Sequence, residues 1–176
     1  MRIIGGKYKG RIFNPGKKFK SRPTTDVAKE GLFNILENRY YFDSKKVLDL
    51  FSGTGGMGYE FASHGAKEIV FVEKSYLHFK FIQTTLNTLQ IENGKVIKTD
   101  VFLFLKKSTD KFDIIFADPP FDLKSLPEIP DQVLNSNLLN DSGIFILEHP
   151  KEFNFTSHPR FSELRKYGKV NFSFFS

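Results

Sequence analysis

The residues of this chain with the clearest chemical potential form the tetrapeptide Asp118-Pro119-Pro120-Phe121, which follows an apolar run at 112–117. If that run is a strand, Asp118 stands at its carboxyl end, where open α/β sheets bind their ligands. The Asp118 carboxylate and the Pro119 carbonyl could then accept both N–H groups of a base amine and direct its lone pair at a methyl carbon. This is catalysis by positioning, and it needs no strong base. Two successive prolines stiffen the turn, and Phe121 offers a flat face for base stacking. These four residues are the predicted catalytic set, and a plain strand-terminating turn is the alternative.

A second candidate site is the glycine-rich turn that follows an apolar run at 46–51. Gly53, Gly55 and Gly58 fit the spacing G-x-G-x-x-G, which lets a ligand approach the backbone between a strand and a helix. Asp49 before these glycines would repel a pyrophosphate, but it suits the sulfonium and ammonium of S-adenosylmethionine. Glu73 ends the next apolar run and is placed to accept hydrogen bonds from ribose hydroxyls. Because dinucleotides use the same contact, Glu73 indicates an adenosine-type ligand without choosing one.

Asp100, after a third apolar run, has two interpretations of equal weight. Its carboxylate could accept a hydrogen bond from an adenine amine, with Val101 offering backbone groups, or it could cap the short helix that follows. The residues expected to bind the cofactor are Asp49, Phe51, Gly53, Thr54, Gly55, Gly58, Glu73, Lys74, Asp100, Val101 and Asp118.

The elements that position these residues alternate along the chain. Buried strands are predicted at 46–51, 68–73, 95–98, 112–117 and 143–148, and helices at 26–41, 55–65, 76–90, 101–107 and 129–139. A closing antiparallel pair is predicted at 161–167 and 170–175. Strands that alternate with helices predict an α/β fold, with a mostly parallel sheet, right-handed crossovers and an antiparallel edge hairpin. In the first helix, Thr25 or Asp26 is expected to cap the first turn, and the inward-facing residues are expected to be Val27, Leu32, Ile35 and Leu36.

The formal net charge of +6 is unevenly distributed over the 176 residues. Residues 1–25 contain eight basic residues and no acidic one, whereas the remainder has 18 basic and 20 acidic residues. We therefore expect a basic N-terminal arm at 1–25, with a hairpin around Lys9-Gly10, attached to a domain at 26–176 within one compact unit. Such an arm is typical of nucleic-acid binding. A solvated basic tail explains the charge equally well.

Composition excludes several other kinds of site. The chain has no cysteine, so disulfides, thiolate zinc sites and cysteine nucleophiles are absent. The four histidines show no metal-ligand spacing, no metal is expected, and His64 and His78 are interpreted as surface helix residues. Glu148 either shapes the base pocket or forms a surface pair with His149. With no apolar run of about 18 residues and no signal peptide, the expected location is the cytoplasm, and the expected state is a monomer.

The motifs in this order resemble the RsmD family of 16S ribosomal RNA guanine-N2 methyltransferases, which have a Rossmann-like class I methyltransferase fold. The resemblance spans nearly the whole chain, and its specific part is the N-terminal block, because other amine methyltransferases share the tetrapeptide type. The residues that carry it are at 2–11, 22–26, 32–36, 49–58, 118–121, 147–148 and 166–169. The chain departs from the family pattern at Val27, where an arginine is usual, and at Lys29, which keeps the charge of a second usual arginine.

The resemblance implies a seven-stranded sheet with helices on both faces, S-adenosylmethionine as methyl donor, and a guanine of the small-subunit RNA as target. It also suggests an assembled or partly assembled small ribosomal subunit as substrate. The residues expected to contact RNA are Arg2, Lys7, Lys9, Arg11, Arg22, Thr24, Thr25 and Lys29.

Three alternatives stand beside this interpretation. A DNA adenine-N6 methyltransferase, or another amine methyltransferase with this tetrapeptide, would share the catalytic turn, although the DNA enzymes usually carry a target-recognition insertion that 176 residues do not accommodate. A non-catalytic ribosome-associated binding protein predicts a degraded loop or tetrapeptide, and both are intact. A nicotinamide-dependent oxidoreductase is disfavoured by Asp49 and by the lack of a second substrate domain.

Overall fold

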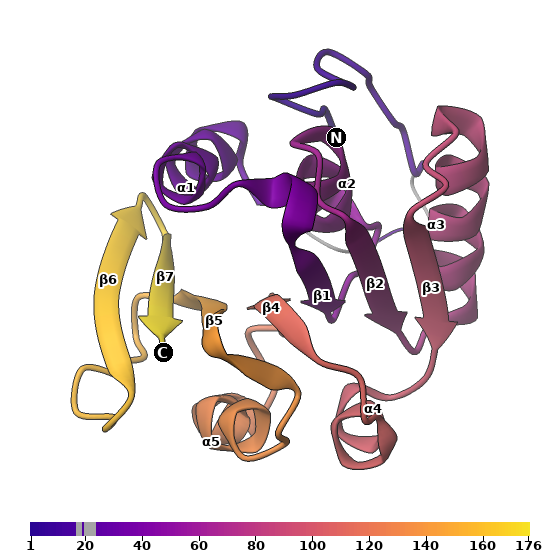
Figure 1. The fold of residues 1–176 in the computed structure, drawn as a ribbon. Helices are drawn as coiled ribbons and strands as arrows, with labels where there is room; N and C mark the ends of the chain where they lie inside the picture. The colour runs from indigo at the N-terminus through magenta and orange to yellow at the C-terminus, as the bar shows by residue number, and fades with distance from the viewer. Residues whose placement is uncertain (17–18, 20–23) are drawn as a thin grey trace.

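The computed structural model describes residues 1–16, 19 and 24–176, and its centre is a seven-stranded sheet in the order β3-β2-β1-β4-β5-β7-β6. The first five strands are parallel, and β7 is antiparallel to both of its neighbours (Figure 1). The strands are β1 (Lys46–Leu50), β2 (Glu68–Glu73), β3 (Gly94–Lys98), β4 (Phe112–Ala117), β5 (Leu139–Pro150), β6 (Phe161–Tyr167) and β7 (Val170–Phe175). The predicted mostly parallel sheet with an antiparallel edge hairpin is confirmed.

Helices cover both faces of the sheet, so its central strands are buried on both sides. On one face lie α1 (Asp26–Glu37), α2 (Gly56–Ser63) and α3 (Tyr76–Leu89), and on the other lie α4 (Val101–Lys107) and α5 (Ile129–Leu134) (Figure 1). Two short 3₁₀ helices, η1 (Phe42–Ser44) and η2 (Leu126–Glu128), lie in the connections. The hydrophobic core is divided by the sheet into two clusters. This division explains why the central strands are apolar at nearly every position.

Side-chain caps begin three of the helices where the sequence places polar residues. Thr25 Oγ1 accepts a hydrogen bond from Ala28 N at 3.3 Å, which decides the predicted choice between Thr25 and Asp26. Ser75 caps α3 in the same way, and Asp100 caps α4. Such caps satisfy backbone N–H groups that have no partner within the helix.

The structure corrects the expected boundaries of two helices. The helix α1 ends at Glu37, not near residue 41, because the chain turns so that Phe42 packs against Phe33 and Phe61 in the core. The helix α5 ends at Leu134, not at 139, because the carbonyl of Leu138 already accepts a hydrogen bond from Phe112 N beside β4. In both places a core contact distant in sequence overrides local helix propensity.

One expected core position of α1 is also wrong. Val27 was predicted to face inward, but its side chain is 71% exposed, whereas Leu32 and Leu36 are fully buried. The helix buries a narrower stripe than the apolar residues of its sequence suggest. Val27 instead lies at the rim of the cavity described below.

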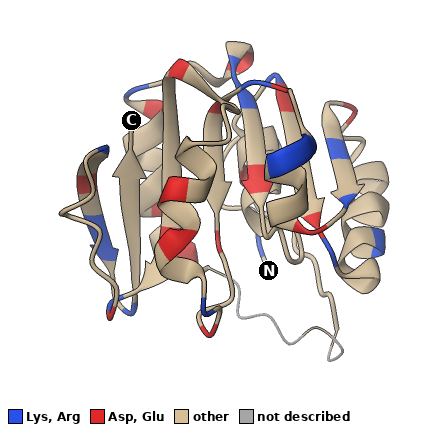
Figure 2. Ribbon diagram, turned by 90° about the horizontal axis from the view of Figure 1, so that it is seen from below, with Lys and Arg blue, Asp and Glu red and all other residues tan. Residues whose placement is uncertain are grey.

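The order of the strands reverses between β1 and β4, which are adjacent in the sheet but start crossovers in opposite directions. Ligands of open α/β sheets bind outside the carboxyl ends of the strands at such a reversal point. Seen from below, the positions of acidic and basic residues are interspersed along the helices and strands of the ribbon (Figure 2). No helix in the described part of the chain is long and apolar enough to cross a bilayer.

Candidate active site

A cavity of about 830 Å³ opens at the carboxyl ends of the parallel strands. Its volume is in the range typical of small-molecule sites. Most of the residues predicted from the glycine loop, the strand ends and the tetrapeptide lie together in its wall: Asp49, Phe51, Gly53, Thr54, Glu73, Lys74, Asp100, Val101, Asp118, Pro119, Pro120 and Phe121. Gly55 and Gly58 do not line the cavity, and they shape the loop beneath it.

The glycine loop between β1 and α2 has a backbone that brings its N–H groups close to the cavity. Gly53 and Gly55 have φ angles of 54° and 82°, in the left-handed region that favours glycine. Phe51 has a φ of 57°, which is rare for a bulky residue and is found mostly at functional sites. Gly58 cannot carry a side chain, because a Cβ would lie 2.0 Å from the ring of Phe71. The last glycine of the motif is therefore required for packing α2 onto the sheet.

Asp49 is buried at the end of β1, directly below this loop. Its side chain is 2% exposed, and its carboxylate accepts a hydrogen bond from Gly58 N at 3.1 Å. The pKa of Asp49 is raised to about 8, mainly by burial; the N–H of Gly58 opposes this shift, and the charge of Glu73 contributes a smaller increase. A cation in the cavity would favour the ionised form. The site thus suits a ligand with a positive charge.

Glu73 is fixed at the end of β2 by the loop itself. Its carboxylate accepts hydrogen bonds from Gly53 N at 2.9 Å and from Ser75 N at 2.7 Å. Burial alone would raise the pKa of Glu73, but the His78 ring, whose Nδ1 lies 3.7 Å from Oε1, and the hydrogen bonds from these two backbone groups produce a net lowering. Glu73 therefore presents a charged acceptor to the cavity, as binding of ribose hydroxyls requires.

Asp100 caps α4 and lines the cavity at the same time. Its Oδ1 accepts hydrogen bonds from Phe102 N at 3.0 Å and from Leu103 N at 3.4 Å. The capping interpretation is confirmed. A contact between Asp100 and an adenine amine stays a prediction, and the cavity leaves both Asp100 and Val101 accessible for it.

The tetrapeptide turns across the opposite wall of the cavity, after β4. Pro119 is buried, Pro120 is exposed, and the ring of Phe121 is 43% exposed at the rim. Such an exposed ring beside a cavity can stack on a flat ligand. Burial, together with the charges of Glu148 and Asp49, raises the pKa of Asp118 well above its ordinary value.

Glu148 lies beside Asp118 at the end of the neighbouring strand. Ala117 of β4 pairs with Leu147 of β5, so the residues that follow them are adjacent at the same edge of the sheet. Burial raises the pKa of Glu148 to about 7, and a hydrogen bond from Thr24 opposes this shift. Two carboxyl groups with raised pKa values in one cavity are typical of functional sites.

The alternative interpretation of Glu148 and His149 as a surface pair is wrong. Glu148 is 2% exposed and His149 is fully buried. Successive residues of a strand point to opposite faces, so His149 turns away from the cavity and contacts Ser173 Oγ at 2.8 Å. The neighbouring strand β7 pairs with β5 at these positions, with Phe172 opposite Glu148 and Asn171 opposite His149.

The predicted hairpin of the N-terminal arm is present and packs on α2. Ile3 N donates to Arg11 O at 3.0 Å, and Gly10 N donates to Ile3 O at 2.9 Å. Ile3 is buried in the core. The side chains of the other predicted RNA contacts in this part of the arm are exposed: Arg2, Lys7, Lys9 and Arg11. Arg22, like Lys17, Lys18 and Lys20, lies outside the described residues.

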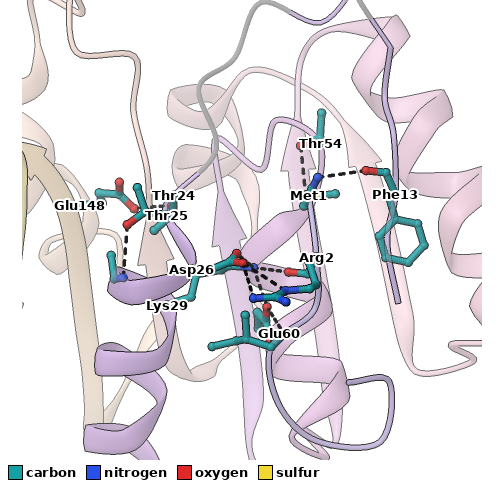
Figure 3. A network of polar contacts seen from close by, with 12 residues as sticks. Met1, Arg2, Phe13, Thr24, Thr25, Asp26, Lys29, Thr54, Glu60 and Glu148 are labelled. Carbon is teal, nitrogen blue, oxygen red and sulfur yellow. Dashed lines mark hydrogen bonds and ion pairs between the residues drawn. The ribbon is translucent and has the colours of Figure 1, made fainter. Parts of the chain in front are cut away.

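Lys29 is the predicted RNA contact that does not fit the structure. Its side chain is 3% exposed, and its Nζ lies 2.8 Å from Glu60 Oε1 and 3.5 Å from Asp26 Oδ1. The same ammonium donates to the carbonyl of Arg2 (Figure 3). Because its charge is enclosed, Lys29 connects the arm to α1 and α2 and does not offer its ammonium to a phosphate.

The two threonines before α1 face the cavity, and one of them bonds to its wall. Thr24 Oγ1 donates to Glu148 Oε2 at 2.7 Å (Figure 3). Thr25 caps α1, as described above, so its hydroxyl already has a structural partner. The segment that enters α1 is therefore fixed against the end of β5.

Several residues in the cavity wall were not predicted. Met1 Sδ lies 3.6 Å from Thr54 Oγ1 over the glycine loop, and no signal in the sequence indicates this. His78 lines the cavity one turn into α3, although it was interpreted as a surface residue, and its position after Glu73 was the available signal. The residues at 167–170 also line the cavity, and the resemblance had marked this stretch without giving it a role.

The strand order, with both motifs at its reversal point, places the chain among the Rossmann-like methyltransferases. Residues 1–176 match the protein family described as conserved hypothetical protein 95. The chain belongs to this family, the RsmD family.

Relatives and solved structures agree with this assignment. The chain is 32% identical to a ribosomal RNA small subunit methyltransferase D of Buchnera aphidicola over 88% of its own length and 78% of the relative. It is 30% identical to the protein of the same name from Escherichia coli K12, over 86% of this chain and 76% of the relative. A hypothetical protein of Thermus thermophilus superimposes with a TM-score of 0.88 and 28% identity, covering 100% of this chain and 99% of that one.

Proposed function

We propose that the protein transfers a methyl group from S-adenosylmethionine to the exocyclic N2 of a guanine in the RNA of the small ribosomal subunit. The observation that carries the proposal is the cavity in which the acidic glycine-loop site adjoins the Asp118–Pro119 turn. The relatives that share the whole architecture are named as methyltransferases of small-subunit ribosomal RNA.

The residues on the β1 and β2 side of the cavity fit S-adenosylmethionine. Asp49 offers a buried carboxylate to the positive charge, and Glu73, which Gly53 N and Ser75 N hold in place, offers acceptor oxygens to the polar groups of the ligand. Asp100 and Val101 lie where the adenine would bind. When bound, this cofactor supplies an electrophilic methyl group on a positively charged sulfur.

The residues on the β4 and β5 side fit the base. The Asp118 carboxylate and the Pro119 carbonyl accept the two hydrogens of the amine, which localises its lone pair and aligns it with the methyl carbon. The nitrogen gains the methyl group and loses one proton, and the electrons of the broken carbon–sulfur bond stay on sulfur. Since the pKa of Asp118 is well above its ordinary value, this carboxylate can take up the departing proton. Phe121 stacks on the base.

The exposed cations of the arm would hold the RNA backbone around the cavity. Arg2, Lys7, Lys9 and Arg11 are available for phosphate contacts, and Arg22 belongs to the same basic stretch of sequence. Thr24 and Thr25 lie at the edge of the base site. We propose an assembled or partly assembled subunit as substrate, a monomeric enzyme and action in the cytoplasm, where such subunits would be met.

The test is methyl transfer from labelled S-adenosylmethionine to small ribosomal subunits from cells that lack this enzyme, followed by nucleoside analysis. The expected product is one N2-methylguanosine in the small-subunit RNA. Label in adenosine, in DNA or in protein, with none in guanosine, would refute the proposal. Comparing intact subunits with the free RNA extracted from them tests the assembled substrate in the same experiment.

A further inference from the structure

Glu148 is a buried carboxylate to which the chemistry above gives no role. Its side chain is 2% exposed. Among the described residues, its carboxylate receives one hydrogen bond, from Thr24 Oγ1 to Oε2 at 2.7 Å. Within the same residues, no donor reaches the second oxygen, Oε1. Glu148 lines the cavity, so a donor that arrives with a ligand can reach this second oxygen.

The position of Glu148 indicates which ligand supplies that donor. It stands next to Asp118, at the end of β5 on the side away from β1. The cofactor residues lie on the β1 and β2 side. If the amine is held at Asp118 and points toward the cofactor, the ring of the base extends toward β5. Glu148 therefore faces an edge of the base and not the methyl donor.

The raised pKa values of Asp118 and Glu148 agree with a ligand that has two neighbouring hydrogen-bond donors. Burial raises the pKa of Glu148 to about 7, and desolvation together with the charge of Glu148 raises the pKa of Asp118 well above its ordinary value. The other ionisable groups in the cavity wall are Asp49, Glu73, Asp100, Lys29, Lys74, Lys169, His78 and Tyr167. Lys29 is already bound to Glu60. Two N–H donors on one rigid edge would satisfy both carboxylates together.

Guanine has such an edge, because its N1–H lies next to its N2 amine. Adenine presents a bare N1 acceptor beside its N6 amine, so a carboxylate at the same place would repel it. A contact at N1 therefore distinguishes guanine from adenine, whereas a contact to the exocyclic amine does not, because both bases have one. A site that offers a buried acceptor to a substrate N–H discriminates strongly against an analogue without it.

We infer that Glu148 accepts a hydrogen bond from N1–H of the target guanine and so selects guanine against bases that carry an acceptor at N1. The inference rests on the proposed function and adds to it the residue that reads the base. Thr24 acts as the positioning residue, because its hydroxyl fixes one oxygen of Glu148 and leaves the other for the base. In this arrangement Asp118 and Pro119 bind the exocyclic amine, and Glu148 recognises the N1–H of the guanine ring.

The experiment compares two substrates and two enzymes. Small-subunit RNA is assembled by ligation with either guanine or 2-aminopurine at the methylated position and is reconstituted into subunits. The base 2-aminopurine keeps the N2 amine but has an acceptor at N1. We expect the wild-type kcat/KM to fall by at least about 100-fold with 2-aminopurine. In Glu148→Gln, whose amide can donate to N1, we expect the preference for guanine to shrink to about tenfold or less.

Two control variants separate recognition from a structural effect. Glu152→Gln removes an exposed carboxylate just beyond β5 and should keep the wild-type preference. Thr24→Val should reduce the preference partially, and Thr24→Ser should restore it. S-adenosylmethionine affinity, measured by calorimetry, should stay within about threefold of wild type in all variants, because Glu148 and Thr24 lie on the base side.

Each outcome decides a different claim. If the wild type methylates both bases within about threefold, or if Glu148→Gln lowers both rates equally, Glu148 does not read N1 and the inference is overturned, while the proposed function stands. If the wild type methylates guanine-containing subunits at no position, the proposed function fails and this inference fails with it.

Discussion

Two buried glutamates of this protein have similar exposure but opposite surroundings. Glu60 is fully buried and Glu148 is 2% exposed. Glu60 meets the Lys29 ammonium at 2.8 Å and accepts hydrogen bonds from Ile4 N at 3.0 and 3.2 Å. Glu148, among the residues that the structure describes, meets a single hydroxyl and lies next to another carboxylate.

The difference separates a structural charge from a functional one. At Glu60 the partners come from the protein, and the result is a closed junction of the arm, α1 and α2. At Glu148 the described part of the protein supplies one hydroxyl donor beside a second carboxyl group, and the carboxylate lines the cavity, where a ligand can reach it. Burial alone does not distinguish the two roles, whereas the count of satisfied hydrogen bonds does.

The largest effect on activity is expected at Asp118, which forms with Glu148 the pair of carboxyl groups that faces the cavity. Asp118→Ala should lower kcat by about 1,000-fold or more, because it removes the acceptor that orients the amine. Its affinity for S-adenosylmethionine should change by less than about threefold. The measurement is single-turnover methyl transfer to small subunits together with calorimetric titration of the cofactor.

The variant Asp118→Asn provides the control for shape. It keeps the size of the side chain and one acceptor oxygen for the amine but cannot take up the departing proton, so it should be more active than the alanine variant and less active than wild type. Activity close to wild type in either variant would remove Asp118 from the assigned role.

At the Lys29–Glu60 ion pair, which joins the arm, α1 and α2, the expected effect is on stability. Lys29→Met leaves the Glu60 charge buried without its partner and should lower the free energy of unfolding by about 3–5 kcal/mol. Glu148→Gln removes a charge that has no cationic partner among the described residues, and it should leave stability unchanged or slightly higher. Denaturant unfolding of both variants makes the comparison direct. Equal destabilisation by the two substitutions would contradict the distinction drawn between these glutamates.

The pH dependence of activity sharpens the same contrast. Both carboxyl groups of the pair have raised pKa values, that of Glu148 being about 7, so their acid forms predominate at low pH. Because the ionised forms accept hydrogen bonds from the base, kcat/KM for subunits should increase with pH below the raised pKa values, by up to about tenfold per unit for each of the two carboxyl groups that must ionise.

Removing Glu148 should shift this profile to lower pH. Glu148→Gln deletes one titrating group, and it also lowers the pKa of Asp118, since the charge of Glu148 helps to raise it. Profiles are measured at saturating S-adenosylmethionine, so that the titration of Asp49 does not contribute. An unchanged profile in the variant would show that the pair does not control activity.

The smallest effects are expected on the exposed side of the arm. Lys7→Ala or Lys9→Ala should weaken subunit binding severalfold and reduce the slope of log affinity against log salt by about 1, as the loss of one phosphate contact predicts. Lys106→Ala, an exposed residue on α4, is the matched control and should leave both quantities unchanged. Binding is measured by filter retention over a range of salt concentrations.

Much of the fold followed from local sequence patterns. The strand ends at Asp49, Glu73 and Asp118 were located because apolar runs of strand length are bounded by polar and glycine residues. The helix boundaries at Glu37 and Leu134 were missed, because contacts with residues far along the chain decide where those helices stop. Local periodicity carries no information about such contacts.

The surroundings of the charged residues in the candidate site were harder to predict than the apolar strands and helices that position them. Lys29 was expected to contact RNA because it keeps the charge of an arginine that is usual in the family, but its partner Glu60 lies 31 residues away in sequence. His78 looked like a surface residue, and its cavity position depends on how α3 packs beside β2. In each case the residue type was clear and the surroundings were not.

By itself, the sequence determined the order and kind of the elements, the glycine loop and the catalytic turn, because each is encoded by residues close together in the chain. Only the tertiary structure decided which buried charges are neutralised and which are left for a ligand. Thr24 and Glu148 are 124 positions apart, and the sheet register sets Glu148 beside Asp118. The environment of a buried charge is a property of the whole fold, since it depends on burial and on partners that no local pattern specifies.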